Sequence, residues 1–154
     1  MLEVLKVLED MNIPRVAAGA ALGLLALAAA QAEQLPPRSA KEGVYSAAQA
    51  NQGKTVYVEK CASCHGTMES VTPDMAPLLN DAGFQNLWRE RSIARLFSRI
   101  LETMPQDKPG TLSPQQTAEI VAYILSANQL PAGDVALPLD LEILRDIRLD
   151  AGEP

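Results

Sequence analysis

The sequence predicts an all-α domain, and three observations support this prediction. Apolar residues recur at helical intervals between Trp88 and Met104, with arginines on the other faces. The segment Ser113-Pro114-Gln115-Gln116 is typical of a helix start, because serine caps, proline suits the first helical position and glutamine completes a capping box. Alternating strand patterns are nearly absent, and aromatic residues make up only 4% of the chain.

Residues 1–32 are typical of an export signal. Arg15 precedes an unbroken run of Val, Ala, Gly and Leu, which ends in the small-x-small cleavage pattern Ala30-Gln31-Ala32. Three acidic residues before Met11 depart from this pattern, and translation from Met11 would give a more typical signal. The run of about 15 residues is short of the ~20 that a spanning helix needs. We therefore expect cleavage after residue 32 and no membrane anchor.

The remaining chain is long enough for one domain. Residues 33–43 contain Pro36 and Pro37 and are expected to form a linker. The domain is expected over 44–133, with Ser46 capping a short alanine-rich turn.

Two further helices are expected within this domain. One covers 53–61, and the helix that starts at Pro114 runs to about Ser126.

Residues 134–154 form a C-terminal tail with apolar residues at helical spacing. These are Leu139, Ile143, Leu144 and Ile147, and the charged residues Asp140, Glu142, Arg145 and Asp146 lie beside them. Two interpretations stay open: a last amphipathic turn packed on its own domain, or a surface that docks on a catalytic chain. The formal net charge of −6 argues against nucleic acid as a partner.

The pentapeptide Cys61-Ala62-Ser63-Cys64-His65 has the spacing of a covalent haem attachment site. Two thiols three positions apart lie on nearly one side of a helical turn, and the next residue offers an imidazole to iron. A thioredoxin-type dithiol, a zinc site and a plain disulfide are the alternatives. A thioredoxin-type dithiol would need a βαβ pattern around it, and a zinc site would need a fourth ligand, but the sequence shows neither. A plain disulfide would leave His65 unexplained.

Together these residues resemble class I cytochromes c, in which helices wrap one covalently attached haem. Gly53 and Tyr57 precede Cys61 where that family has a small residue and an aromatic in its first helix. Ile120 and Tyr123 lie where its last helix crosses the first, and a glycine there would let the two backbones approach. The resemblance implies one haem c per chain, bound through Cys61 and Cys64.

The resemblance also implies roles around the iron. Pro77 corresponds to the family's proline, whose carbonyl accepts the Nδ1 proton of the ligand histidine, here His65. Met104 follows a full helix and is the expected sixth ligand, with Met75 or an open position as alternatives. Trp88 is a candidate partner for a haem propionate, and a core position is the alternative explanation. The arginines that follow it are weaker candidates for the same contact, and a solvated helix face is their alternative explanation.

The expected function is electron transfer in the periplasm, without enzymatic activity. The segments 43–50, 104–113 and 130–133 are similar to cytochromes that accompany periplasmic quinoprotein dehydrogenases. This similarity implies a pyrroloquinoline quinone enzyme that oxidises an alcohol or sugar as the electron donor, and a terminal oxidase as the acceptor. A haem-based gas sensor and a non-catalytic cytochrome subunit of a dehydrogenase are the alternatives.

Overall fold

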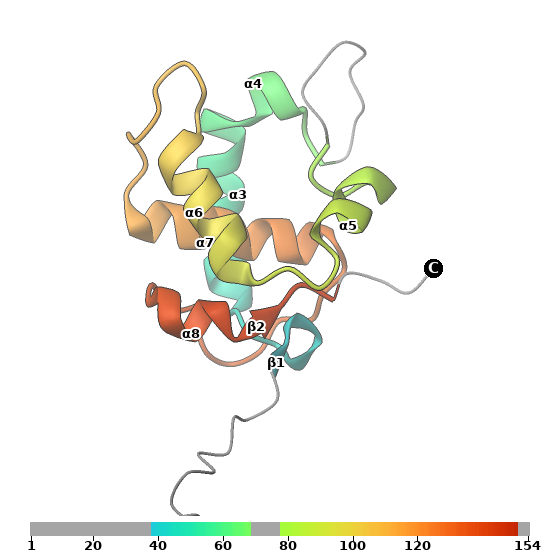
Figure 1. Cartoon of the computed structure of the whole chain (residues 1–154). Helices are drawn as coiled ribbons and strands as arrows, with labels where there is room; N and C mark the ends of the chain where they lie inside the picture. The colour runs from blue at the N-terminus through green and yellow to red at the C-terminus, as the bar shows by residue number, and fades with distance from the viewer. Residues whose placement is uncertain (1–37, 69–77, 151–154) are drawn as a thin grey trace, which may run out of the picture. The chain divides into compact units, whose positions relative to one another are not determined.

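The computed structural model describes residues 38–68 and 78–150, whose regular structure is mostly helical (Figure 1). The elements in chain order are β1 (Arg38–Ser39), η1 (Ala40–Glu42), α3 (Ala47–Lys60), α4 (Ala62–His65), α5 (Ala82–Trp88), α6 (Ile93–Thr103), α7 (Pro114–Ala127), α8 (Leu141–Arg145) and β2 (Ile147–Arg148). The two strands hold two residues each and pair in parallel. The predicted helical fold is confirmed, with one short strand pair added.

Helix α3 begins earlier than the sequence predicts. Ser46 has an extended backbone, and its side-chain oxygen accepts a hydrogen bond from the Gln49 N–H at 3.2 Å. This bond satisfies one of the free N–H groups at a helix start. The alanine-rich turn expected after Ser46 is therefore the first part of one 14-residue helix. Because that helix is continuous, it leads directly to Cys61.

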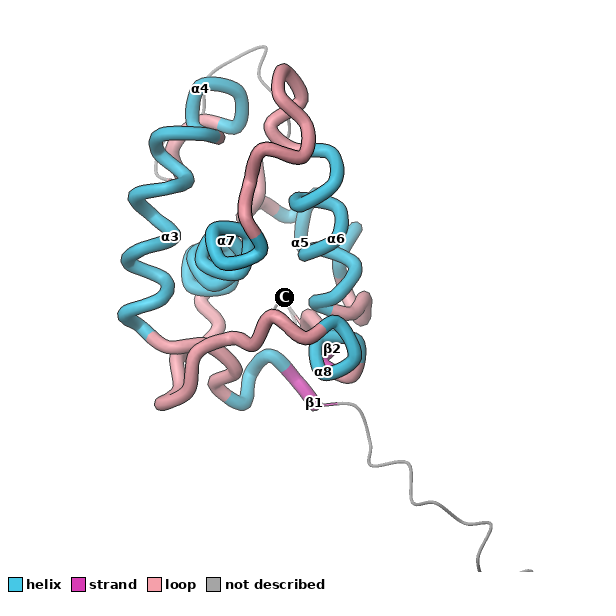
Figure 2. Tube along the Cα trace, turned by 90° about the vertical axis from the view of Figure 1, so that its left-hand side faces the viewer, coloured by secondary structure: helices cyan, strands magenta, loops and turns pink. Residues whose placement is uncertain are grey.

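Helices α3 and α7 cross in close contact, and Gly53 lies at the crossing. A Cβ atom on Gly53 would lie 1.8 Å from the backbone oxygen of Glu119 in α7, so a side chain would force the helices apart. Beside the crossing, the ring centroids of Tyr57 and Tyr123 are 5.3 Å apart. Figure 2 looks almost along α7, with α3 on one side and α6 on the other. The glycine expected at this crossing is confirmed.

The helical spacing of apolar residues from Trp88 to Met104 belongs to two helices. Trp88 ends α5, and α6 begins at Ile93. Between them Glu90 has a φ of 60°, in the left-handed region that a right-handed helix excludes. Ser92 then has the extended backbone of a residue that precedes a helix. The chain turns here, so α5 and α6 are separate helices.

Helix α7 begins as predicted and forms the centre of the core. The Ser113 Oγ accepts from the Gln116 N–H at 3.1 Å, and the Gln116 Oε1 accepts from the Ser113 N–H at 3.0 Å. Ile120, Ile124 and Leu125 are no more than 1% exposed. Burial stabilises the fold by roughly 1.5–3 kcal/mol for each such side chain, so α7 holds the neighbouring helices together.

The C-terminal segment is held on the domain through β1 and α3, among other contacts. In the strand pair, Arg38 lies opposite Ile147. On α3, the Gln49 side-chain amide donates to the Leu137 carbonyl at 3.1 Å and its oxygen accepts from the Leu137 N–H at 2.7 Å, both in buried positions. Both backbone groups of Leu137 are thus satisfied by one side chain, which fixes this segment against α3.

The described parts of the expected linker (33–43) and tail (134–154) are packed against the domain. Ala40, Leu144 and Leu149 are at most 1% exposed, and α8 contacts α6. The whole expected export signal (1–32) and residues 33–37 of the expected linker lie outside the described residues. Within the described ranges, no helix combines the length and apolar character needed to cross a membrane.

Candidate haem site

The cysteine motif forms a tight turn directly after α3. The Cys61 N–H donates to the Tyr57 carbonyl at 2.8 Å, in the bonding pattern of α3. The Cys61 carbonyl in turn accepts from the His65 N–H at 2.9 Å, which closes the single helical turn α4. Because a helical turn holds 3.6 residues, Cys61 and Cys64 lie on nearly the same side of it. The histidine follows immediately.

Tyr57 ties the end of this turn back to α3. Its O–H donates to the Gly66 carbonyl at 3.1 Å, and Gly66 ends the turn with a φ of 70°, which favours glycine. The Tyr57 side chain is fully buried. Burial raises the pKa of Tyr57, and the nearby Cys61 and Tyr123 add to the rise. The phenol therefore stays protonated at neutral pH and keeps donating this bond.

The two cysteines have different environments. Cys61 is buried and Cys64 is exposed, and no disulfide joins them. Burial raises the pKa of the Cys61 thiol to about 11, with a further contribution from Cys64. A thioredoxin-type dithiol depends on a lowered thiol pKa. The environment of Cys61 therefore argues against that alternative.

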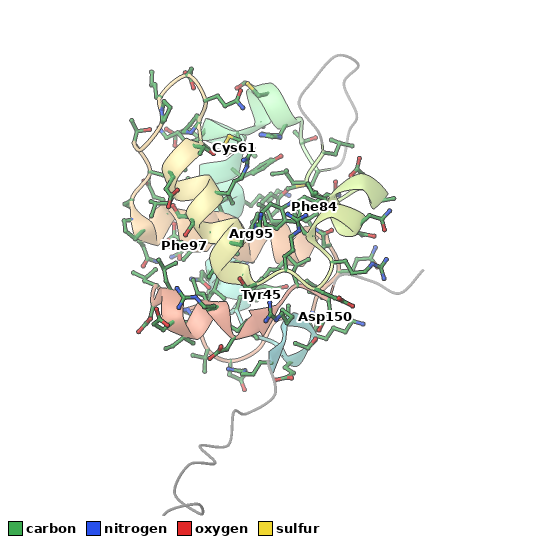
Figure 3. The ribbon with its side chains drawn as sticks, viewed as in Figure 1. Tyr45, Cys61, Phe84, Arg95, Phe97 and Asp150 are labelled. Atoms are coloured by element: carbon green, nitrogen blue, oxygen red, sulfur yellow. The ribbon has the colours of Figure 1, made fainter. Side chains whose placement is uncertain are left out.

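A cavity of about 1750 Å³ opens beside the motif. Cys61, Cys64 and His65 contribute to its lining, together with residues of α5, α6, α7 and the segment after α6. Its volume exceeds the roughly 300–1,000 Å³ of typical small-molecule pockets. Figure 3 shows Cys61, Phe84 and Arg95 placed around this space by three different parts of the chain. The cavity is thus large enough for a bulky ligand attached at the motif.

Met104 lines the same cavity as the motif. It ends α6, where its N–H donates to the Ile100 carbonyl at 3.0 Å. Its side chain is partly buried and packs against the hydrophobic core. Helix α6 therefore brings a thioether to the cavity that also receives the only histidine of the chain.

Residues 48–124 match the model of a family described as cytochrome c oxidase, cbb3-type, subunit III. This range covers half of the chain and contains the cysteine motif, α5, α6 and Met104. The chain belongs to this family of cytochrome c domains. Cytochromes c carry haem bound covalently through C-x-x-C-H and transfer electrons. The predicted type of cofactor and the general role of this cytochrome are therefore established by its family.

A comparison with solved structures found the crystal structure of the sulfane dehydrogenase SoxCD from Paracoccus pantotrophus, at 21% identity and a TM-score of 0.49. The match covers 80% of this cytochrome and 63% of the SoxCD chain, so the cytochrome spans less than two thirds of that chain's length. No curated protein matches the sequence.

The donor set of the cytochrome fits a haem c. Two thiols at the attachment spacing, an imidazole and a thioether line one cavity, and these groups suit haem attachment and iron ligation. The same cavity is lined by the buried apolar side chains of Phe84, Leu96 and Ile100. A bound haem would supply one-electron chemistry at its iron. These apolar residues would keep water away from much of the macrocycle.

Trp88 and three arginines also line this cavity. Trp88 is buried at the end of α5, and the Arg91 guanidinium lies 5.7 Å from the centre of its ring. Arg95 and Arg99 follow at intervals of four residues and line the cavity as well. The sequence interpretation favoured a solvated face for the arginines. Arg95 and Arg99 are four positions apart on α6, a spacing that could have placed these two together. Arg91 lies in the turn before α6, so that spacing does not apply to it.

Phe84 is a lining residue that the sequence interpretation missed. It belongs to α5, a helix that was not predicted. Asp81 starts this helix, since its Oδ1 accepts from the Phe84 N–H at 2.7 Å. An aspartate three residues before an apolar position is a weak signal by itself. Pro77 and Met75 lie outside the described residues, so their expected roles stay predictions.

Proposed function

We propose that this cytochrome is a periplasmic one-electron carrier with haem iron held between His65 and Met104. The observation that carries the proposal is the shared cavity, which is lined by the attachment motif on one part of the chain and by Met104 on another. Cys61 and Cys64 would form the two thioether bonds to the haem. Pro77 would accept the Nδ1 proton of His65 and so orient its Nε2 toward iron.

Two protein ligands would leave no iron position for a substrate, so the chemistry is outer-sphere electron transfer. The thioether of Met104 would favour the reduced state relative to a second imidazole. Phe84, Leu96 and Ile100 would add to this effect, because a less solvated site disfavours the extra positive charge of oxidised iron. Each protein residue therefore has a role in holding or tuning the centre, and none acts on a substrate.

The proposed donor is a pyrroloquinoline quinone dehydrogenase that oxidises an alcohol or sugar. Its support is the similarity of segments 43–50, 104–113 and 130–133 to cytochromes that accompany such enzymes. Oxidation of an alcohol to a carbonyl compound releases two electrons and two protons. Each substrate would thus reduce two molecules of the cytochrome. The proposed acceptor is a terminal oxidase, and the family's description as an oxidase subunit supports it.

The Met104→Ala variant tests the ligand assignment. Loss of the thioether should convert the oxidised spectrum from low-spin to high-spin and lower the reduction potential. Met68→Ala is the matched control, because Met68 also packs against the core and is absent from the cavity lining, and it should keep a low-spin spectrum. A low-spin spectrum in Met104→Ala would refute the assignment. If Met75→Ala instead lost the low-spin spectrum, Met75 would be the ligand.

Carbon monoxide separates the carrier from a gas sensor. A firmly bound Met104 should leave the reduced protein with negligible carbon monoxide binding near neutral pH, whereas a sensor would bind it rapidly. Reduction of the purified cytochrome by candidate quinoprotein dehydrogenases, followed by haem absorbance, tests the donor. If no such enzyme reduces it while another periplasmic donor does, the proposed donor is wrong.

A further inference from the structure

We propose that the outer face of the C-terminal segment docks the cytochrome on a second protein whose surface is apolar at its centre and basic at its rim. This C-terminal face consists of Val135, Leu139, Leu141 and Ile143. The proposal concerns attachment, so it goes beyond electron transfer and does not require the assigned iron ligands.

The first support is a concentration of exposed apolar side chains. Among the described residues, six large hydrophobic side chains are exposed, and four of them form the C-terminal face. Their exposed fractions are 74% for Val135, 45% for Leu139, 38% for Leu141 and 48% for Ile143. Single exposed apolar residues are ordinary, but four within nine positions are a local concentration, and concentrations of exposed apolar surface mark interaction sites.

The second support is that this segment is held in place. Leu137, Leu144, Ile147 and Leu149 are at most 2% exposed, so four residues anchor the segment in the core. The Leu149 N–H also donates to the backbone of Arg91 at 2.9 Å. The outward side chains therefore have fixed positions, and binding a partner would require little ordering of the chain.

The third support is charge. Asp134, Asp140, Glu142 and Asp146 are all exposed and lie between or beside the apolar residues. Arg145 is the only basic residue from 134 to 146, and it pairs with Glu142 at 2.6 Å. The face thus has an excess of negative charge. A partner with lysine or arginine around an apolar centre would complement it.

The same charges argue against two other occupants. A second copy bound through this face would bring the acidic rim against itself, because a two-fold interface pairs the same patch on both subunits. An anionic membrane surface would be repelled by the same carboxylates. A different protein with a basic rim is therefore the occupant that the surface favours.

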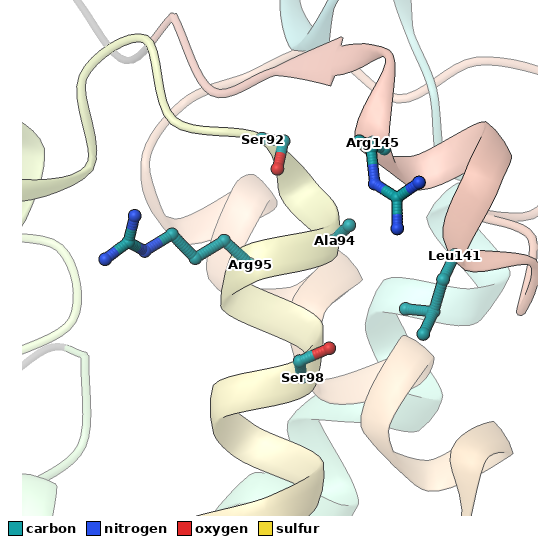
Figure 4. A pocket seen from close by; sticks show the side chains of 6 residues that line it. All are labelled: Ser92, Ala94, Arg95, Ser98, Leu141 and Arg145. Carbon is teal, nitrogen blue, oxygen red and sulfur yellow. The ribbon is translucent and has the colours of Figure 1, made fainter.

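The position of the C-terminal face leaves the haem cavity accessible. Helix α8 packs on α6, and a shallow groove of about 220 Å³ between them is lined by Leu141, Arg145, Ser92, Ala94, Arg95 and Ser98. Figure 4 shows the Arg95 side chain extending away from Arg145, and Arg95 also lines the large cavity. Arg95 and Ser98 line both the groove and the cavity, but none of the four apolar residues of the C-terminal face lines the cavity. A partner on the C-terminal face would retain the cytochrome while a second protein exchanges electrons at the cavity.

Site-specific photo-crosslinking of the full holo protein in its native cells tests the proposal. A photoreactive amino acid is placed at Ile143, and at Val58 as a control, because Val58 is an exposed apolar residue of α3 with 52% exposure. The expected result is crosslinking from position 143, but not from 58, to one peptide of a different protein. That peptide should lie on a surface with apolar residues and lysine or arginine.

The identified partner is then purified and its affinity measured. Leu139→Ser should weaken binding by about tenfold, from the apolar area that binding would cover. Asp134→Lys should weaken it further, and added salt should weaken binding of the unmodified chain. Met104→Ala should leave the affinity for the partner unchanged, because Met104 is not part of the C-terminal face. The docking proposal and the assignment of the iron ligand can therefore fail independently.

Four results would overturn the proposal. These are crosslinks from position 143 to another copy of the cytochrome, crosslinks to lipid, equal yields from positions 143 and 58, and partner affinity that Leu139→Ser leaves unchanged.

Discussion

Substitution of Gly53 by alanine should loosen the crossing of α3 and α7. The added Cβ would lie 1.8 Å from the Glu119 backbone oxygen, 2.4 Å from its carbonyl carbon and 3.1 Å from the Ile120 nitrogen. All three are backbone atoms, so no side-chain rotation relieves the overlap. Even a contact of 3.0 Å would require the two helices to separate by more than 1 Å. Such a shift disturbs the packing of the whole crossing.

The expected cost follows from two opposing effects. In an open helix, replacing glycine by alanine stabilises by about 1 kcal/mol. Forcing a group into a close-packed interior costs about 1–3 kcal/mol and sometimes more. An overlap with rigid backbone lies at the upper end, so we expect a net loss of about 3 kcal/mol for Gly53→Ala. For a domain of this size, the melting temperature should fall by roughly 10 °C.

Guanidinium unfolding of the holo protein, followed by far-ultraviolet circular dichroism, measures this effect. Gly83→Ala in α5 is the matched control, because the three nearest atoms to its added Cβ all belong to the Asp81 side chain, the closest at 3.3 Å. That variant should differ from the unmodified protein by less than about 1 kcal/mol. If Gly53→Ala is as stable as the unmodified protein, the inferred close approach of the helices is wrong.

Three further substitutions have defined outcomes. Tyr57→Phe removes the bond to the Gly66 carbonyl and should cost about 1 kcal/mol at neutral pH. Because burial raises the Tyr57 pKa, the unmodified protein should lose stability above about pH 10, and Tyr57→Phe should lose less. If the free energy of unfolding falls equally with pH in both proteins between pH 8 and 11, this reasoning is wrong. Gln49→Leu leaves both backbone groups of Leu137 unpaired, so denaturant unfolding should show a loss of about 3 kcal/mol, and unchanged stability would exclude the two bonds. Ser113→Ala should lower the free energy of unfolding by about 1 kcal/mol in the same assay. Ser126→Ala, on the exposed side of α7, is the control and should change it very little. Equal losses of stability in the two variants would argue against the cap.

The parts of the fold that the sequence predicted best have local physical causes. The reciprocal bonds of Ser113 and Gln116 depend on residues three positions apart, so their pattern is visible in the sequence and the start of α7 is confirmed. Gly53 was placed through its resemblance to a known helix crossing, and its contact with Glu119 confirms that placement. The attachment motif has a fixed spacing and needs no tertiary information to be noticed.

The parts that were missed depend on distant residues. Helix α5 has seven residues, too few for a clear helical period, and two of them become buried through contacts with the rest of the domain. Strands β1 and β2 have two residues each, so neither shows an alternating pattern. The arrangement of Arg91, Arg95 and Arg99 around the cavity depends on the turn before α6, which the apolar spacing alone does not reveal.

The parallel strand pair has a consequence for the order in which the protein opens. It joins Arg38 to Ile147, which are about 110 residues apart in the chain. Closing so long a loop costs about 4 kcal/mol of chain entropy, more than a two-residue ladder can offset. The pair should therefore form only after α3 and α7 have assembled, and it should be among the first contacts to open. In native-state hydrogen exchange, the backbone amides of α3 and α7 should therefore exchange slowly, and those of the strand pair faster. A partner bound to the C-terminal face should slow the exchange of the strand pair without altering the haem cavity.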